Sequence, residues 1–199
     1  SPSPVAGLAI ALSGLRRLER VPNLGLGAPL CIALWFVLTM QRNSVWQDES
    51  TLWRDVAEKN PQSARSYIYL GNIARSTGDA PKALLHYGRA LENDPHSAVA
   101  RAGLAAAYQD LGQFDKAIRA FEMALEEQPN MVDLHYSLGR VLQQAERYSE
   151  AQAYYLQLQP NSPHYGIALN NLGTLNELEG QVDSALYYYV SARRHGAVD

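Results

Sequence analysis

Histidine, cysteine and acidic residues do most metal binding and acid–base catalysis, so their spacing is the first test for chemistry in this chain. The histidines show no paired metal-binding spacing; they are His86, His96, His135, His164 and His195. The single cysteine, Cys31, excludes an internal disulfide and a second thiolate for a zinc site. Because Cys31 lies in an apolar run, we expect it to be a small buried apolar side chain.

Motifs of known catalytic sites are also missing from the sequence. It contains no G-x-S-x-G, P-loop or G-x-G-x-x-G pattern. The adjacent acids Asp48 and Glu49 are better interpreted as first-turn acids of a helix, where the positive end of the helix dipole favours them. We therefore predict that the chain is not an enzyme and has no catalytic, cofactor-binding or metal-binding residue.

The elements that position the remaining residues follow a repeat of 34 residues, the pattern to seek before any local interpretation. Leucine, a small residue, alanine and an aromatic residue each recur at this step, and proline closes the first three units. The series are Leu70, Leu104, Leu138 and Leu172; Gly71, Ala105, Gly139 and Gly173; Ala83, Ala117, Ala151 and Ala185; Tyr87, Phe121, Tyr155 and Tyr189; and Pro95, Pro129 and Pro163.

Each class has a structural reason in a pair of antiparallel helices. Small residues belong where two helix axes cross, and leucine and aromatic residues fill the space between helices. Gly78, Gly112 and Gly180 fall at turns that need a positive φ, which is cheap only for glycine. Glu146 takes that place in the third unit and predicts a less ideal turn. Pro160 predicts that the second helix of that unit ends early, near Leu158.

These residues resemble the tetratricopeptide repeat (TPR) family over residues 64–199. The resemblance implies an all-α superhelical solenoid with units at 64–97, 98–131, 132–165 and 166–199. Pro61 lies one step before Pro95. Residues 42–63 are therefore expected to be a junction that contains an N-terminal half-repeat.

An apolar segment precedes the junction and predicts a transmembrane helix over residues 21–41. Residues 24–40 carry no charge, and about 20 such residues are needed to cross a bilayer. A signal peptide and a buried soluble helix are the alternatives, and residues 1–20 form a short apolar and basic segment. The side chains expected to contact lipid are Leu24, Leu30, Ile32, Leu34, Trp35, Phe36 and Leu38.

The distribution of charge predicts the location and excludes one class of partner. Arg16, Arg17 and Arg20 precede the span, which favours the cytoplasm for that side and an extracytoplasmic repeat region that is periplasmic, extracellular or lumenal. The formal charge of the chain is −3, and the basic residues of segment 1–43 leave the repeats acidic. An acidic solenoid argues against nucleic acid as a partner.

The junction carries a second resemblance, to the C-terminal region of transmembrane and TPR-containing O-mannosyltransferase-like proteins. In that family a polytopic glycosyltransferase body precedes TPRs that face the lumen or exterior. No catalytic residue can be carried over, because that body is not in this chain. The matching residues are Arg42, Asn43, Trp46, Asp48, Glu49, Leu52, Trp53 and Pro61.

In TPRs the first helix of each unit lines a concave face, and this face is the predicted site for proteins or peptides. A solvated face without a ligand is the alternative for any single residue. Capture of a peptide's terminal carboxylate is not expected, because lysines are missing from the positions that would provide it. The predicted binding residues are Arg65, Ile68, Asn72, Arg75, Gln109, Tyr136, Arg140, Gln143, Asn170 and Glu177.

These patterns together predict a membrane-anchored TPR scaffold for protein–protein interaction. No polar capping helix follows the fourth unit, and Leu172, Leu175, Leu178 and Leu186 could leave an apolar edge. Such an edge predicts a homo-oligomer or a filament. The alternative is the C-terminal TPR region of an O-mannosyltransferase-like glycosyltransferase that selects acceptor proteins.

Overall fold

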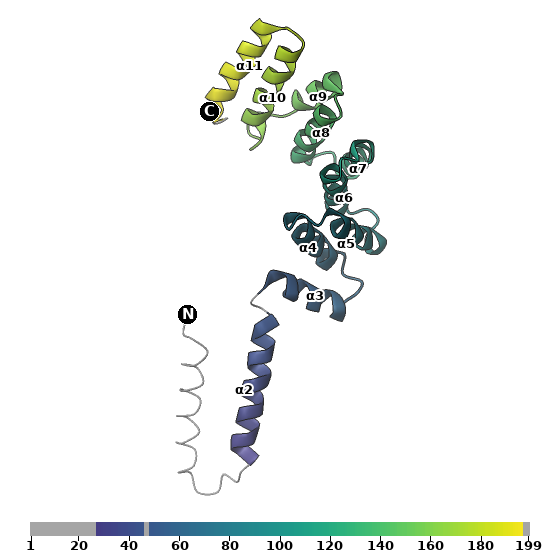
Figure 1. The fold of residues 1–199 in the computed structure, drawn as a ribbon, viewed down its shortest axis with the longest axis vertical. Coiled ribbons are helices and arrows are strands. Elements are labelled where there is room, and N and C mark those ends of the chain that lie inside the picture. The colour runs from purple at the N-terminus through teal and green to yellow at the C-terminus, as the bar shows by residue number, and fades with distance from the viewer. Residues whose placement is uncertain (1–26, 46–47, 197–199) are drawn as a thin grey trace. The chain divides into compact units, whose positions relative to one another are not determined.

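The protein is described from a computed structural model, which covers residues 27–45 and 48–196. This part of the chain is all helical and has no strand. Its helices, shown in Figure 1, are α2 (Gly27–Val45), α3 (Glu49–Lys59), α4 (Ala64–Ser76), α5 (Ala80–Asn93), α6 (Ala98–Asp110), α7 (Phe114–Glu127), α8 (Val132–Gln144), α9 (Tyr148–Tyr155), α10 (Tyr165–Leu178) and α11 (Val182–Arg194). The chain divides into two units between Asp55 and Val56, and each is described by itself.

Within α2 of the first unit, the side chains of residues 31–40 are mostly apolar and mostly solvent-exposed. Leu34, Trp35 and Leu38 are 54–68% exposed, and Cys31 is exposed as well, so the expected burial of the cysteine is wrong. Among residues 27–45 and 48–196, no helix combines the length and apolar character that crossing a membrane requires. The transmembrane helix predicted over residues 21–41 is therefore not supported by the described residues, where the uncharged apolar stretch of α2 runs only over residues 27–40 and is shorter than the roughly 20 residues that a span needs. Residues 21–26, including Leu24, lie outside the described part.

Helix α3 begins where the adjacent acids predict a helix start. The carboxylate of Asp48 accepts hydrogen bonds from the backbone N–H of Ser50, at 3.3 Å, and from its hydroxyl. These bonds lower the pKa of Asp48. Glu49 lies in the first turn, as expected. Both acids thus stabilise a helix N-terminus.

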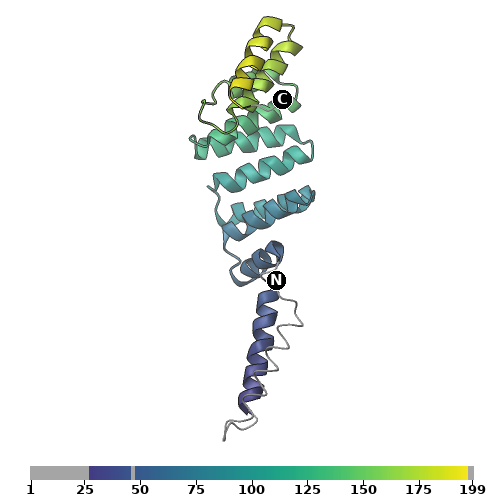
Figure 2. The same ribbon diagram turned by 90° about the vertical axis from the view of Figure 1, so that its left-hand side faces the viewer.

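The second unit is built from four helix pairs stacked one after another (Figure 2). The turn within each pair needs one residue with a positive φ. Gly78, Gly112 and Gly180 take values of 68–78°, which confirms their predicted role. Glu146 takes φ 60° in the third pair, and it is the non-glycine residue with positive φ in the described chain. The predicted departure from an ideal turn is therefore real.

In the first, third and fourth pairs the two helices cross where a glycine packs against an aromatic ring, whereas the second pair has Ala105 and Phe121 at these positions. A Cβ added to Gly71 would lie 2.6 Å from the ring of Tyr87, and Gly103 of the next pair closes on the same ring from α6. Gly139 and Gly173 approach the rings of Tyr155 and Tyr189 in the same way. The repeated small residue therefore allows the aromatic side chain to lie between the helices.

The third pair differs from the others because α9 has 8 residues, whereas α5 and α7 have 14 each. It ends at Tyr155, before the expected Leu158. Pro160 cannot continue a helix, and it disfavours helical backbone at the residue before it. Leu158 leaves the helix but remains in the core, with 4% of its surface exposed.

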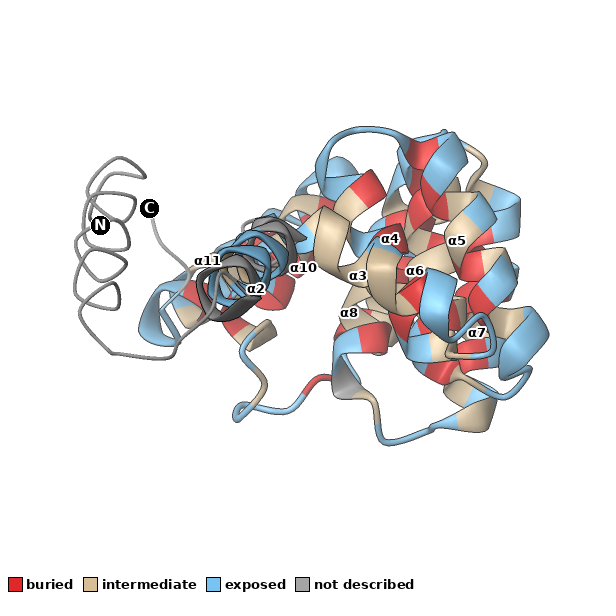
Figure 3. Cartoon of the chain, turned by 90° about the horizontal axis from the view of Figure 1, so that it is seen from below, coloured by how far each residue is buried: buried red, intermediate tan, exposed pale blue. Residues whose placement is uncertain are grey.

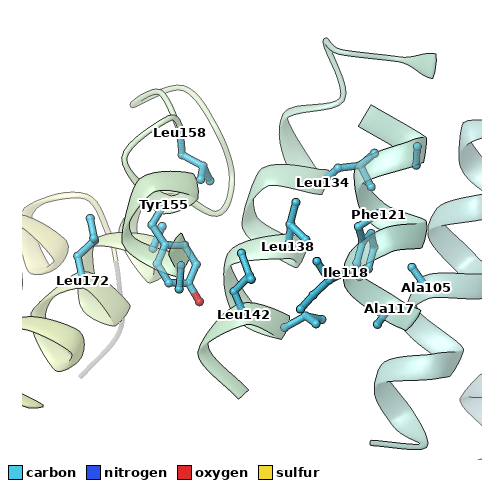
Figure 4. Packing of buried hydrophobic residues seen from close by; sticks show 14 of the residues in the cluster. Ala105, Ala117, Ile118, Phe121, Leu134, Leu138, Leu142, Tyr155, Leu158 and Leu172 are labelled. Carbon is cyan, nitrogen blue, oxygen red and sulfur yellow. The ribbon is translucent and has the colours of Figure 1, made fainter. Parts of the chain in front are cut away.

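The core of the second unit runs along the stack. Buried residues lie on the helix faces that turn toward neighbouring helices, and exposed residues lie outside (Figure 3). A continuous apolar cluster joins the second, third and fourth pairs, and Figure 4 shows Ile118, Leu142 and Tyr155 within it. A smaller cluster with Tyr87 at its centre joins the first pair to α6. Each pair is stabilised by its neighbours, as in other solenoids.

Candidate functional site

The candidate site is the surface formed by α4, α6, α8 and α10, the first helices of the four pairs, and is called the first-helix face below. Polar side chains join these helices to one another. Arg75 of α4 lies 3.9 Å from the carboxylate of Asp110 on α6. Both side chains are 43% exposed, so this ion pair orients the two groups more than it stabilises the fold.

A buried amide lies at the centre of the first-helix face. Gln109 is 7% exposed, and both ends of its amide are paired with α8. Its Nε2 donates to Oε1 of Gln144 at 2.5 Å, and its Oε1 accepts from Nη2 of Arg140 at 3.1 Å. A buried amide with both ends satisfied holds its partners in place. Gln109 therefore positions the exposed guanidinium of Arg140, which has further N–H donors.

The core tyrosines reach this face with their hydroxyl groups. Tyr155 donates to Oε1 of Gln143 at 2.9 Å and accepts from Nδ2 of Asn171 at 3.1 Å. Burial is the main cause that raises the pKa of Tyr155 well above its usual range, so the hydroxyl stays neutral. In the first pair Tyr87 donates to Oδ1 of Asn72 at 2.6 Å.

In the fourth pair Tyr189 donates to Oε2 of Glu177 at 2.7 Å. Tyr87 and Tyr155 are buried in the core, and Tyr189 is half-buried with its ring against Gly173; each places its oxygen at the first-helix face. Core packing thus fixes the orientation of polar groups on the predicted binding surface.

Most of the predicted binding residues take part in these contacts. Asn72, Arg75, Gln109, Arg140, Gln143 and Glu177 belong to the hydrogen bonds and the ion pair described above. Arg65 is exposed and lies over the ring of Tyr69, 5.7 Å from its centroid. Ile68 packs against the smaller apolar cluster, and Asn170 is exposed.

Tyr136 of α8 stacks on His164, which lies immediately before α10. The ring centroids are 4.5 Å apart and the planes differ by 9°. Nε2 of His164 also lies 3.5 Å from the carboxylate of Asp133. Tyr136 is therefore already covered on one face by a residue of this chain.

Sequence reasoning did not identify the partners that orient the predicted residues, among them Asp110, Gln144 and Asn171. One signal was available. Three units have tyrosine where the second has Phe121, and a buried tyrosine usually needs a partner for its hydroxyl. Polar residues on the facing first helix could have been sought on that ground.

Apolar side chains lie between the polar groups of the first-helix face. Val99 of α6 is 49% exposed and Ile167 of α10 is 44% exposed, and Ala102 and Ala106 are half-buried. The face thus offers N–H donors beside apolar surface. Within residues 27–45 and 48–196, no group of three or more His, Cys, Asp or Glu side chains is placed to hold a metal ion.

Comparison with known proteins agrees with this repeat architecture. Family models described as tetratricopeptide repeat match residues 74–130, 103–166 and 136–197, and together they span more than half of the chain. The chain belongs to the tetratricopeptide repeat family. No catalytic family is identified, and the curated proteins give no match.

Solved TPR structures share the fold. A crystal structure of MamA is 20% identical, with a TM-score of 0.68 over 79% of this chain and 92% of that one. YrrB, described as a TPR protein with an unusual peptide-binding site, is 28% identical, with a TM-score of 0.63 over 73% of this chain and 75% of its own.

MamA from Desulfovibrio magneticus RS-1 is 15% identical, with a TM-score of 0.67 over 82% of this chain and 93% of that one. At these identities the two MamA structures establish the fold alone. None of the comparisons bears on the resemblance of residues 42–72 to O-mannosyltransferase-like proteins, which stays a prediction.

Proposed function

We propose that this TPR array is a protein-interaction scaffold whose first-helix face binds an extended segment of a partner protein. The observation that carries the proposal is the arrangement around Gln109. The buried amide of Gln109 holds the exposed guanidinium of Arg140 in one orientation and leaves its other N–H groups open to a ligand. Held in place, Arg140 loses less conformational freedom when it binds a ligand.

The chemistry of the face suits a peptide backbone or a carboxylate. Arg140 supplies N–H donors, and Val99 on the neighbouring helix supplies exposed apolar surface. Extended peptides need donors for their carbonyl groups and pockets or surface for alternate side chains. The peptide-binding site named for YrrB supports this type of ligand for the fold.

Selection of random peptides displayed on phage, panned against the whole chain, tests the proposal. Affinities of the selected peptides are then measured by fluorescence anisotropy for wild type, Arg140→Gln and the matched control Arg119→Gln. Arg119 is also exposed but lies on the second helix α7. Losing a charged hydrogen bond costs about 1.5–3 kcal/mol, so Arg140→Gln should weaken binding about tenfold or more.

The control Arg119→Gln should bind like wild type. Selected peptides that bind Arg140→Gln and wild type with the same affinity would place their site elsewhere and refute this role of the first-helix face. Circular dichroism spectra of the three proteins should coincide, because Arg140 is exposed and its removal opens no cavity.

We also propose that α2 attaches the array to a membrane. The support is its apolar side chains, of which Leu34, Trp35 and Leu38 are more than half exposed. Flotation with lipid vesicles should carry the wild-type chain upward, whereas Leu34→Asp with Leu38→Asp should leave it in the lower fractions. Leu85→Asp, at a 55% exposed residue of α5, is the control and should float. Wild-type chain that stays in the lower fractions would refute attachment through α2.

An extracytoplasmic location of the repeats is proposed on the arginines that precede the apolar segment, Arg16, Arg17 and Arg20, which lie outside the described residues. Protease added to intact spheroplasts that express the chain should then cleave the repeats. Repeats that are cleaved only after lysis would refute this location.

Self-association is proposed through the exposed side of α11. Leu186 is 61% exposed, although it occupies the repeat position of Ile118, which is 3% exposed in the core. Leu178 is 62% exposed, whereas Leu172 and Leu175 are buried and do not belong to this edge. A second copy would cover Leu186. Sedimentation should show an oligomer that Leu186→Glu dissociates, and a monomeric wild type would refute the proposal.

A further inference from the structure

A cavity of ≈ 450 Å³ lies among α9, the chain that follows it, α10 and α11. It exists because α9 ends early. In the first two pairs the second helix continues to Asn93 and Glu127, whereas α9 stops at Tyr155 and the following residues leave the helix. The space of the missing turns is only partly refilled, by Leu158.

The floor of this cavity is apolar and its wall is aromatic. Leu158, Leu169 and Leu172 line it and are buried. Tyr187 and Tyr188 of α11 also line it, with ring centroids 5.4 Å apart and planes at 71°. Tyr187 is 68% exposed. A side chain entering from solvent would therefore pass an exposed ring and reach buried leucines.

The rim is basic. Arg194 and His195, at the end of α11, are exposed and line the cavity together with Ser191. The imidazole of His195 meets the ring of Tyr165 edge-on, with centroids 5.0 Å apart, which joins the end of α11 to the start of α10. No aspartate or glutamate is among the residues that line this cavity, all of which are described.

The basic rim is peculiar to this unit. At the repeat position of Arg194 the first two units have Glu92 and Glu126, and at that of His195 they have Asn93 and Glu127. The helix dipole favours cations at a helix C-terminus, but the first two units show that this fold does not require them there. The sign of charge is thus reversed beside the cavity.

We infer that this cavity is a second binding site for an acidic segment of a partner protein. One aromatic or large aliphatic side chain of that segment enters the cavity between α9 and α11. The inserted group would contact the buried leucines, and a neighbouring carboxylate would pair with Arg194. The site is distinct from the polar group of Gln109, Arg140 and Gln144, because none of these three residues lines it, although α10 contributes to both surfaces.

A labelled peptide of the proposed chemistry tests the inference. The probe is fluorescein-labelled acetyl-Asp-Glu-Trp-Leu-Asp-Glu-amide, and its anisotropy is measured with the whole chain. Two matched probes carry lysine in place of every acid, or alanine in place of tryptophan and leucine. We expect saturable binding of the first probe and about tenfold or weaker binding of each of the others.

Two variants and two controls locate the bound peptide. Arg194→Glu restores the acid found at this position in the first two units, and Ser191→Phe fills the cavity mouth. Each should weaken binding about tenfold or more. Arg193→Glu changes the same charge one residue away, at an exposed residue that does not line the cavity, and should have a much smaller effect. Arg140→Gln should have none.

Three results would overturn the inference. They are absence of saturable binding up to about 1 mM chain, equal affinity for the acidic and lysine probes, and equal loss in Arg193→Glu and Arg194→Glu. Loss of binding in Arg140→Gln alone would assign the peptide to the first-helix face and also overturn it. Melting curves of Ser191→Phe and Arg194→Glu that match wild type would show that the losses do not come from unfolding.

Discussion

Replacing Glu146 by glycine should stabilise the repeats, although the substitution removes a side chain and adds no new contact. Glu146 adopts φ 60° at the end of α8, where the other three units have glycine. For an L-residue with a side chain this left-handed conformation costs about 1–2 kcal/mol, and glycine avoids the cost. Glycine also gains freedom in the unfolded chain, which offsets about 0.4–1 kcal/mol.

The expected net gain for Glu146→Gly is therefore between about 0 and about 1.6 kcal/mol, with a central value of about 0.8 kcal/mol. Urea unfolding followed by circular dichroism measures it as a shift of the midpoint with an unchanged slope. Hydrogen exchange should locate the gain in α8 and α9, because each repeat is coupled mainly to its neighbours.

Glu146→Ala separates backbone strain from the loss of the carboxylate. Alanine keeps the Cβ and so keeps the strain, and this variant should be no more stable than wild type. If Glu146→Ala stabilises as much as Glu146→Gly, the carboxylate and not the backbone is the cause, and the reasoning fails. It also fails if Glu146→Gly lowers the midpoint.

Three other outcomes follow from single sites. Gln152→Leu should raise the free energy of unfolding by about 1–3 kcal/mol, as measured by urea unfolding. The buried Nε2 of Gln152 has no hydrogen-bond partner among the described residues, and the first two units have apolar side chains at this repeat position. Gly139→Ala should lower the free energy of unfolding by about 1–3 kcal/mol, because the new Cβ would lie 2.7 Å from a core tyrosine ring, whereas Gly88→Ala, with open space, should not. The pKa of Glu127 is lowered chiefly by the hydrogen bond from Arg101. Ionised Glu127 therefore stabilises the folded chain above its ordinary pKa of 4.5, and this stability is lost as the pH falls through its pKa in the folded chain. Glu127→Gln should flatten the acid limb of a curve of unfolding free energy against pH.

The repeated part of the fold could be predicted because its causes are local. Glycine at a positive φ and a small residue against a ring each leave a mark at a fixed step, and Gly78 and Gly139 show both. The residues of the first-helix face could be placed for the same reason, since residues such as Arg140 inherit their direction from the repeat, whereas their role in binding stays a prediction.

What could not be predicted depends on contacts between units. That Gln109 is buried and bound at both ends follows from the approach of α6 to α8, which no spacing in the sequence encodes. The apolar segment is a different case. Hydropathy predicted a membrane span over residues 21–41, but no helix among residues 27–45 and 48–196 is long and apolar enough to cross a membrane, and residues 21–26 of the predicted span lie outside the described part.

The irregularities of the third unit occur together and can be separated by their effect on the cavity. Glu146, with its positive φ, and Gln152, with its buried Nε2 that lacks a partner among the described residues, do not line the cavity, whereas the early end of α9 creates it. If the short α9 is retained because it forms the binding cavity, affinity for the acidic peptide should depend on α9 being short. That affinity should not depend on the residues at positions 146 and 152. Glu146→Gly combined with Gln152→Leu should then stabilise the chain and leave affinity for the acidic peptide unchanged. Stabilisation of the double variant with a loss of that affinity would mean that the cavity needs a loose third unit, and not only a short α9.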